Sequence, residues 1–436
     1  MNGALAIFKI RVYCPVLATT ELIHETGQLN LLAKLLPRWR QLPLYRDALA
    51  GCVQADWNCF QRLPLLAKRA MRENFPHNFF PDAKAFASLV EQNLIEREHT
   101  SGTSEERLPV IFPMGWWDEQ ERRALRLNRY IADVIEQYPS ARRATITSPA
   151  CNGLTCPTVW MSREQRIIGH SLFVNLARIP FLLSEADLAR MAAEVAGWAP
   201  QFLDLDPVQG VWFALYCERK GIQFPSLKFA LCSYEFVSVV HRKILSRVFG
   251  VPICNLYGST ETGHLLMENE HGEMKPSHET ALLELTEMAP NGVGDLVVTT
   301  LSNDYMPLLR YRIGDLAERR AQPDGNVFII HGRARDALVA GDGSRITTWQ
   351  VDQCFADISG IAHYELRQSE SNECILRYVP DVAAPTAADL LKVTSRLKAL
   401  LKLAAPIKTE AMTTLVPAAS GKFRLTCRVT EAARTG

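Results

Sequence analysis

The sequence lacks the signatures of several protein classes. Its 11 cysteines include no C-x-x-C pair and no cysteine–histidine cluster at metal-ligand spacing, so neither a structural zinc site nor a disulfide framework is expected. No segment approaches the length of a membrane span, and Lys9 and Arg11 interrupt the apolar run of residues 4–8. These absences predict a cytoplasmic protein without a signal peptide or a membrane anchor.

An excess of charge of one sign is also missing. The chain carries 48 Lys and Arg against 47 Asp and Glu, a net charge of +1, and it has no dense basic block. This balance argues against nucleic acid or an anionic membrane as the dominant partner. The chain has 436 residues, of which 47% are hydrophobic. It is therefore long enough for two or three domains with sizeable cores.

Hydrophobic periodicity predicts helices with short breaks over residues 1–98, and helices together with strands from there to about residue 200. Three-and-four spacing of apolar residues favours helices, and short apolar runs bounded by turn residues favour strands. Helices are expected at 38–49, 82–95, 119–137 and 184–196, the last capped by Ser184, and strands at 110–112 and 144–147.

The clearest supersecondary pattern is a β-α-β unit between residues 227 and 256. The apolar run 227–232 predicts a strand, Ser238 caps a helix that Gly250 ends, and a second strand follows at 251–256. In a parallel sheet, ligand sites collect where strands end. The loops after these two strands are therefore expected to lie at one edge of the sheet.

The remainder of the chain changes character twice. Short strands separated by turn residues, between 281 and 333, predict a small barrel or a second sheet. A polar hairpin follows Asp336, and then come a helix at 349–355, strands at 363–367 and 373–379, and a helix at 387–403. About a hundred residues of mixed α and β structure predict a small α+β domain of its own.

One stretch concentrates groups that suit a nucleotide, NLYGSTETG at 255–263. Gly258 permits a sharp turn and the close approach of a ligand. Ser259 and Thr260 offer hydroxyls for phosphate oxygens, Glu261 a carboxylate for a hard divalent cation, and Tyr257 an aromatic face. The same residues also fit a plain turn at the end of a strand.

A second candidate is the hydroxyl-rich loop that precedes the strand at 110–112. Backbone amides, helped by the hydroxyls of Ser101, Thr103 and Ser104, would wrap a polyphosphate. A solvated surface loop is the alternative. Downstream, Asp315 beside Arg312 would equally form a sheet-edge ion pair, and Lys422 would equally be a solvated loop lysine. Tyr234, Trp116 and Trp117 fit packing better than catalysis.

Six of these segments occur in a recognisable order: TSGTSEERLPV, SYE, NLYGSTETG, YRIGD, GRARD and PAASGKFR. Together they resemble the adenylate-forming superfamily of acyl- and aryl-CoA synthetases, most closely its phenylacetate–CoA ligase-like branch. The resemblance implies an α/β fold with a large adenylation domain, 1–335, built of parallel sheets with helices and a small barrel-like part. It also implies a small α+β lid domain, 336–436, that moves about a hinge at Asp336.

The resemblance further implies an ATP-dependent ligase that forms an acyl-AMP from a carboxylic acid and then an acyl-CoA thioester. Catalysis would rest on Lys422, Thr260 and Glu261. Lys422 would bridge the carboxylate and the α-phosphate, Thr260 would donate to the α-phosphate, and Glu261 would hold Mg²⁺. The implied nucleotide-binding residues are Ser101, Gly102, Thr103 and Ser104 for the β- and γ-phosphates, Ser233, Tyr234, Glu235 and Tyr257 around adenine, Gly258, Ser259 and Thr260 in the turn, and Asp315 and Arg333 at the ribose.

The substrate implied by the resemblance is an aromatic acid, of the kind used in secondary metabolism. It would be walled by residues 148–160 and by the loop before Glu235. Coenzyme A is the implied acceptor, while a carrier-protein thiol or a hydroxyl that takes the AMP itself remains open, as does a homodimer. Glu105 stands where the family's phosphate loop has glycine, which keeps a nucleotide-binding homologue without turnover as a third alternative.

Overall fold

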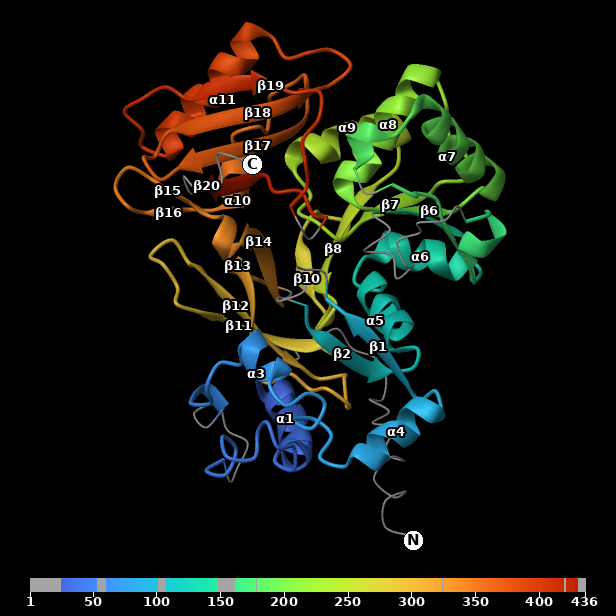
Figure 1. Ribbon diagram of the computed structural model, residues 1–436, viewed down its shortest axis with the longest axis vertical. Coiled ribbons are helices and arrows are strands. Elements are labelled where there is room, and N and C mark those ends of the chain that lie inside the picture. The colour runs from blue at the N-terminus through green and yellow to red at the C-terminus, as the bar shows by residue number, and fades with distance from the viewer. Residues whose placement is uncertain are drawn as a thin grey trace.

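The computed structural model describes residues 25–52, 60–100, 107–147, 161–177, 179–323, 325–418 and 421–429. Its centre is a 12-stranded sheet in the order β11-β12-β13-β14-β10-β9-β8-β7-β6-β3-β5-β4 (Figure 1). A second, four-stranded sheet lies in the C-terminal part of the chain. This mixed architecture confirms the predicted α/β fold class with a large sheet and a smaller C-terminal sheet domain.

The large sheet contains strands from residue 143 to residue 333. They are β3 (Arg143–Ile146), β4 (Ile167–Ile168), β5 (Ser171–Phe173), β6 (Phe202–Leu205), β7 (Phe229–Cys232), β8 (Ile253–Ser259), β9 (Gly263–Glu268), β10 (Met274–Pro276), β11 (Ala281–Thr286), β12 (Val293–Thr300), β13 (Tyr311–Gln322) and β14 (Gly325–Arg333).

The parallel half of this sheet is covered by helices on both faces. Phe202 of β6 packs with α5 (Trp116–Leu125) and α6 (Arg129–Gln137), whereas Leu203 and Leu205 pack with α7 (Glu185–Trp198) and α8 (Pro207–Lys220). Every residue of β6 and β7 is buried. That pattern is typical of parallel strands that contact helices on each side.

The predicted β-α-β unit is confirmed. It consists of β7, α9 (Val239–Phe249) and β8, and β7 pairs with β8 in parallel. The Ser238 hydroxyl accepts a hydrogen bond from the Val240 amide, and Gly250 ends the helix in the left-handed conformation, φ +63°. The two candidate loops after β7 and β8 therefore leave the same edge of the sheet.

The strands expected to form a barrel or a second sheet instead continue the first one. β8 pairs with β7 in parallel and with β9 antiparallel, so it joins the two halves. The antiparallel half packs against the N-terminal elements α1 (Glu25–Trp39), α3 (Lys68–Arg72), α4 (Ala83–Glu91) and the hairpin of β1 (Ile95–His99) with β2 (Pro109–Pro113).

Two expected helices differ from their predictions. The helix expected at 38–49 is absent because α1 ends at Trp39 and residues 40–51 form turns. Pro43 lies inside that window, and proline has no amide hydrogen to continue a helix. The helix expected at 119–137 is two helices, since Asn128 caps α6 by accepting from the Ile131 amide.

The C-terminal domain follows the predicted order. It contains the hairpin β15 (Leu338–Val339) and β16 (Arg345–Ile346), α10 (Thr348–Gln353), and a sheet with the order β19-β18-β17-β20. These strands are β17 (Ile361–Ser369), β18 (Cys374–Pro380), β19 (Lys408–Ala411) and β20 (Thr426–Val429), and α11 (Ala387–Leu400) completes the domain. Val240 of α9 is part of its buried core, so this domain packs directly on the large sheet's helical layer.

The turn between β8 and β9 depends on two glycines that face each other. A Cβ atom on Gly258 would lie 2.1 Å from the carbonyl oxygen of Gly263, and one on Gly263 would lie 2.7 Å from the ring of Trp116. Gly263 also has φ +77°, which favours glycine. The glycines of NLYGSTETG are therefore required by close backbone packing.

We predict that Gly258→Ala lowers the free energy of unfolding by about 1–3 kcal/mol, because the backbone must shift to admit one methyl group. Gly197→Ala is the matched control. That glycine is an exposed helical residue with nothing within 4 Å of an added Cβ, so alanine there should stabilise the protein by up to about 1 kcal/mol. Urea unfolding measures both changes, and equal effects would contradict the packing argument.

Candidate functional site

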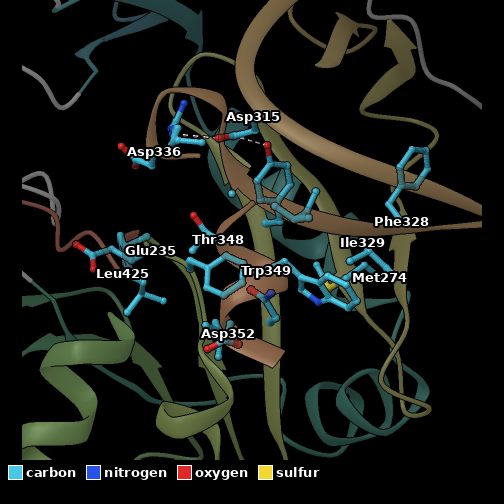
Figure 2. A pocket seen from close by; sticks show the side chains of 18 of the residues that line it. Glu235, Met274, Asp315, Phe328, Ile329, Asp336, Thr348, Trp349, Asp352 and Leu425 are labelled. Atoms are coloured by element: carbon cyan, nitrogen blue, oxygen red, sulfur yellow. Dashed lines mark hydrogen bonds and ion pairs between the residues drawn. The ribbon is translucent and has the colours of Figure 1, made fainter. Parts of the chain in front are cut away.

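A cavity of about 920 Å³ opens between the carboxyl edge of the large sheet and the C-terminal domain. Figure 2 shows Asp315 and Asp336 on one side of it, and Met274, Phe328 and Ile329 on another. Among the predicted site residues, those that line the cavity are Tyr234, Glu235, Tyr257, Gly258, Asp315, Arg333 and Lys422. Five of the six sequence motifs therefore line the cavity: SYE, NLYGSTETG, YRIGD and GRARD in the strands and loops of the large sheet, and PAASGKFR, with Lys422, in the C-terminal domain.

Asp315 sits in a fixed pair of contacts at the cavity wall. The Tyr257 hydroxyl donates to its Oδ2 at 2.6 Å, and Arg333 Nε lies 3.0 Å from its Oδ1. Burial, with the negative charge of Asp315 added, raises the pKa of Tyr257 well above its usual value, so its hydroxyl stays protonated and donates. The alternative of an ion pair between Asp315 and Arg312 is not formed, because Arg312 pairs with Glu287 and Asp295.

Glu261 is buried and ionised beside the same strands. Burial alone raises the pKa of this carboxyl group, but the Lys68 ammonium at 3.4 Å and a hydrogen bond from the Tyr311 hydroxyl at 2.6 Å bring it below its ordinary value. Ser259, two residues earlier, shares a hydrogen bond with Thr262. Glu261, Thr260, Ser259 and Ser233 lie outside the set of residues that line the cavity.

Lys68 is a site residue that the sequence did not reveal. It opens the short helix α3 and lines the cavity together with Arg72 of that helix. The segment before α3 is tied to β13, because the Leu66 amide donates to the Arg310 carbonyl and the Arg312 amide donates to the Leu66 carbonyl. Basic residues at 68, 69 and 72 were the only signal, and they also fit an ordinary exposed helix face.

The loop 233–235 receives the lysine loop of the C-terminal domain, residues 421–425. Lys422 Nζ donates to the Tyr234 carbonyl oxygen at 2.7 Å, and the Phe423 amide donates to Glu235 Oε1 at 2.9 Å. Tyr234 has φ +71°, which is unusual for a residue other than glycine. Two hydrogen bonds between segments 188 residues apart thus set the position of Lys422.

The hydroxyl of Ser233 and the hydroxyl of Tyr234 both bind the buried carboxylate of Asp204. Ser233 Oγ donates to Asp204 Oδ1 at 3.0 Å, and the Tyr234 hydroxyl donates to Asp204 Oδ2 at 2.8 Å. Burial raises the pKa of Asp204 despite the attraction of Arg143. The tyrosine side chain therefore packs as the sequence indicated, while its carbonyl group meets Lys422.

Aromatic rings surround Phe423 on the other side of the lysine loop. Its ring centroid lies 5.6 Å from that of Phe181 and 5.3 Å from that of His363. His363 of β17 shares a 3.0 Å hydrogen bond with His241 of α9, and both imidazoles are buried. At this pair of histidines the C-terminal domain contacts helix α9, which covers the large sheet.

The predicted phosphate loop, Ser101, Gly102, Thr103 and Ser104, lies outside the described residues, as does the whole segment 148–160 of the predicted acid-pocket wall. The residues that flank the loop are paired with each other. The Thr100 amide donates to the Leu108 carbonyl, and the Leu108 amide donates to the Thr100 hydroxyl, both at 3.0 Å. Trp116 is packed as expected, stacked on Phe112 at 5.0 Å.

Known proteins resemble this chain in sequence and in fold. No protein-family model matches the sequence. Protein CapK of Staphylococcus aureus is 29% identical over 120 residues, which span 26% of this chain and 26% of that relative. The phenylacetate-coenzyme A ligase of Pseudomonas putida is 23% identical over 357 residues, 74% of each chain.

A solved structure covers more of the chain. The 2-hydroxyisobutyryl-CoA ligase in the postadenylation state, in complex with 2-HIB-AMP, superposes with a TM-score of 0.66 over 96% of this chain and 94% of that one, at 15% identity. The same ligase in the thioesterification state gives a TM-score of 0.52. No helix in the described ranges combines the length and apolarity needed to cross a membrane. Six motifs in family order, this fold and these relatives together support the resemblance of the chain to the adenylate-forming superfamily.

Proposed function

We propose that the protein is an ATP-dependent carboxylic acid ligase that forms an acyl-AMP and then an acyl-CoA thioester. In the first step a carboxylate oxygen bonds to the α-phosphorus of ATP and pyrophosphate leaves. In the second step the thiol sulfur of coenzyme A bonds to the acyl carbon, and AMP leaves. The observation that carries the proposal is that one cavity joins Lys422 of the C-terminal domain to Tyr257, Asp315 and Arg333 of the large sheet.

In this proposal Lys422 offsets the charge that makes the first step difficult. Carboxylate and triphosphate are both anions, so positioning and charge neutralisation are the main tasks of the protein. The hydrogen bond to the Tyr234 carbonyl and the neighbouring contact of the Phe423 amide with Glu235 keep Lys422 at the cavity. An ammonium group fixed before the reaction need not reorganise during it.

In this proposal two buried carboxylates, Asp315 and Glu261, bind the ribose and the metal ion. Asp315, oriented by Tyr257 and Arg333, would accept the ribose hydroxyls. Glu261 is the residue that would hold Mg²⁺, which suits an ionised carboxylate acting together with phosphate oxygens. In the part of the chain that the structure describes, no three His, Cys, Asp or Glu side chains gather to bind a metal by themselves. The bound cation would neutralise phosphate charge, and Lys68 already supplies one positive charge beside Glu261.

The second step needs the lysine loop to leave. We place the domain boundary at Asp336, with residues 1–335 as the adenylation domain and 336–436 as the mobile lid. Asp336 is paired with Arg424, and its carbonyl oxygen accepts from the Thr426 hydroxyl, so the hinge and the lysine loop are linked. The Pseudomonas putida relative favours an aromatic acid as substrate and the phenylacetate–CoA ligase-like branch.

The first experiment is ATP–pyrophosphate exchange across a panel of aryl and alkyl acids with Mg²⁺. We expect exchange that depends on the acid and is strongest with an aromatic one, and mass analysis should then find an acyl-CoA when coenzyme A is added. If a thioester forms only when a carrier-protein thiol is supplied, the acceptor is the carrier protein and not coenzyme A. Tight ATP binding without exchange for any acid would contradict the proposal.

Replacing the lysine should separate the two steps. Lys422→Ala should lower the exchange rate by about 10²- to 10³-fold, since a preorganised charge is lost, while thioester formation from supplied acyl-adenylate changes little. Lys408→Ala, at an exposed position of the same domain, serves as the control and should leave both rates unchanged. An equal loss of both steps in the Lys422 variant would refute this role.

Docking of the lid should depend on pH through the histidine pair. Burial lowers the pKa of His241 to about 3 and, with His241 beside it, holds the pKa of His363 well below its usual value. When the lid undocks, both return toward about 6.5. Protons therefore bind the undocked form better. The free energy of docking is most favourable above about pH 6.5, and below that pH it weakens by up to about 1.4 kcal/mol per pH unit for each imidazole.

Three carboxyl groups near the docked surface act in the opposite direction. Burial raises the pKa of Asp206 and of Asp352 to about 6, and it also raises that of Glu235. The wild type and the His363→Gln variant both contain these three carboxyl groups, so the difference between their pH profiles reports the histidine alone. From pH 7.5 to 5.5 the exchange rate of the wild type should fall at least about tenfold further than that of the variant. Parallel profiles would show that the histidines do not titrate on undocking.

A further inference from the structure

Helix α9 contacts the C-terminal domain along most of its length. Four side chains, from the N-cap Ser238 to Arg247, have polar partners in that domain. Ser238 binds Asp352 and His241 binds His363. Lys243 binds carbonyl groups after α10, and Arg247 binds Asp381. Figure 1 shows α9 beside β17 and the C-terminal domain. No other helix of the large sheet layer has this number of polar partners in that domain among the described residues.

At the N-terminus of α9, a carboxylate of the other domain serves as a cap. Asp352 of α10 is 1% exposed, and its oxygens accept from the Ser238 hydroxyl and, at 2.9 Å, from the Val239 amide. The first amides of a helix have no partner within the helix, and the helix dipole favours negative charge there. Asp352 also accepts from the Tyr364 hydroxyl of its own domain at 2.9 Å.

Lys243 makes the reverse contact one turn further along α9. Its Nζ donates to the carbonyl oxygens of Phe355 at 3.2 Å and Ile358 at 3.1 Å. These carbonyls lie in the turn that follows α10, which ends at Gln353, and the Phe355 carbonyl also accepts from the Ile358 amide. Asp352 of α10 thus caps the N-terminus of α9, Lys243 of α9 binds the turn after α10, and both contacts cross the domain boundary.

This contact is close in sequence to the loop that receives Lys422. Ser238 lies three residues after Glu235, and β7, the loop 233–235 and α9 are consecutive. The lysine loop and α10 belong to the same domain, so fixing α10 on α9 also limits where Lys422 can lie. The Arg247–Asp381 pair at the far end of α9 also crosses the boundary, but the arginine side chain is 44% exposed, so solvent weakens this pair more than the contacts of the buried Asp352.

We propose that Asp352 and Lys243 form a latch between α9 and the segment of α10 with the turn after it, and that this latch positions Lys422 for adenylate formation and must open for thioester formation. Both are positioning residues, since neither is needed to contact the reacting atoms. The kinetic part of this inference rests on the proposed function, whereas the docking part does not.

The test uses variants from both sides of the boundary in the full-length protein. Asp352→Asn removes the charge at the helix N-terminus, and Lys243→Met removes the donor from an exposed position where folding should be spared. Asp342→Asn is the control, because this exposed carboxylate pairs with Lys402 inside the C-terminal domain. Ligand-free scattering profiles report docking, and the two half-reactions are measured separately.

We expect both latch variants to show a larger radius of gyration than the wild type and the control. Their exchange rate should fall about tenfold, as expected for losing hydrogen bonds to a charged group, and thioester formation from supplied acyl-adenylate should be unchanged or faster. Unchanged scattering and exchange in Lys243→Met would overturn the latch, even if Asp352→Asn misfolds. Absence of exchange in the wild type would count against the proposed function only, because scattering still tests docking.

Discussion

The site depends on two hydrogen bonds between the C-terminal domain and the loop after β7. Lys422 donates to the Tyr234 carbonyl and the Phe423 amide donates to Glu235. They hold Lys422 at the cavity, beside other lining residues of the C-terminal domain such as Thr348 and Trp349. The ring of Phe423 contacts Phe181 and His363, and His363 is hydrogen-bonded to His241, so these aromatic contacts adjoin the lysine loop.

The other constraint is the balance of buried charge. Asp315, Glu261 and Asp204 are each buried, and each has partners that donate hydrogen bonds or supply positive charge. A buried carboxylate without such partners would be costly. Lys68 and Arg333 therefore stabilise the protein's own carboxylates, and in our proposal Lys68, Arg333 and Lys422 also neutralise the charge of an anionic nucleotide.

The sequence predicted most of what depends on local rules. The unit β7, α9, β8 was found because its cap, Ser238, and its terminator, Gly250, are adjacent to the periodic segment that they bound. Asp315 and Lys422 were found through the resemblance, because their motifs are short and ordered. The helix expected at 38–49 was wrong because its apolar spacing was given more weight than Pro43.

Contacts between distant segments were not predictable in this way. Lys68 reaches Glu261 only because residues 66–68 run beside β13. Asp352 meets Ser238 across 114 residues, and neither residue alone differs from an ordinary helical aspartate or serine cap. Such pairs follow from how distant segments pack within and between the two domains, which periodicity and motif spacing do not encode.

The most direct test of acyl-AMP formation follows an oxygen atom. An acid that supports exchange is labelled with ¹⁸O in its carboxylate and incubated with the protein, ATP, Mg²⁺ and coenzyme A, and the AMP is analysed by mass spectrometry. If the carboxylate attacks the α-phosphate, each AMP formed carries one ¹⁸O atom. Unlabelled AMP, or label in inorganic phosphate released with ADP, would contradict the account.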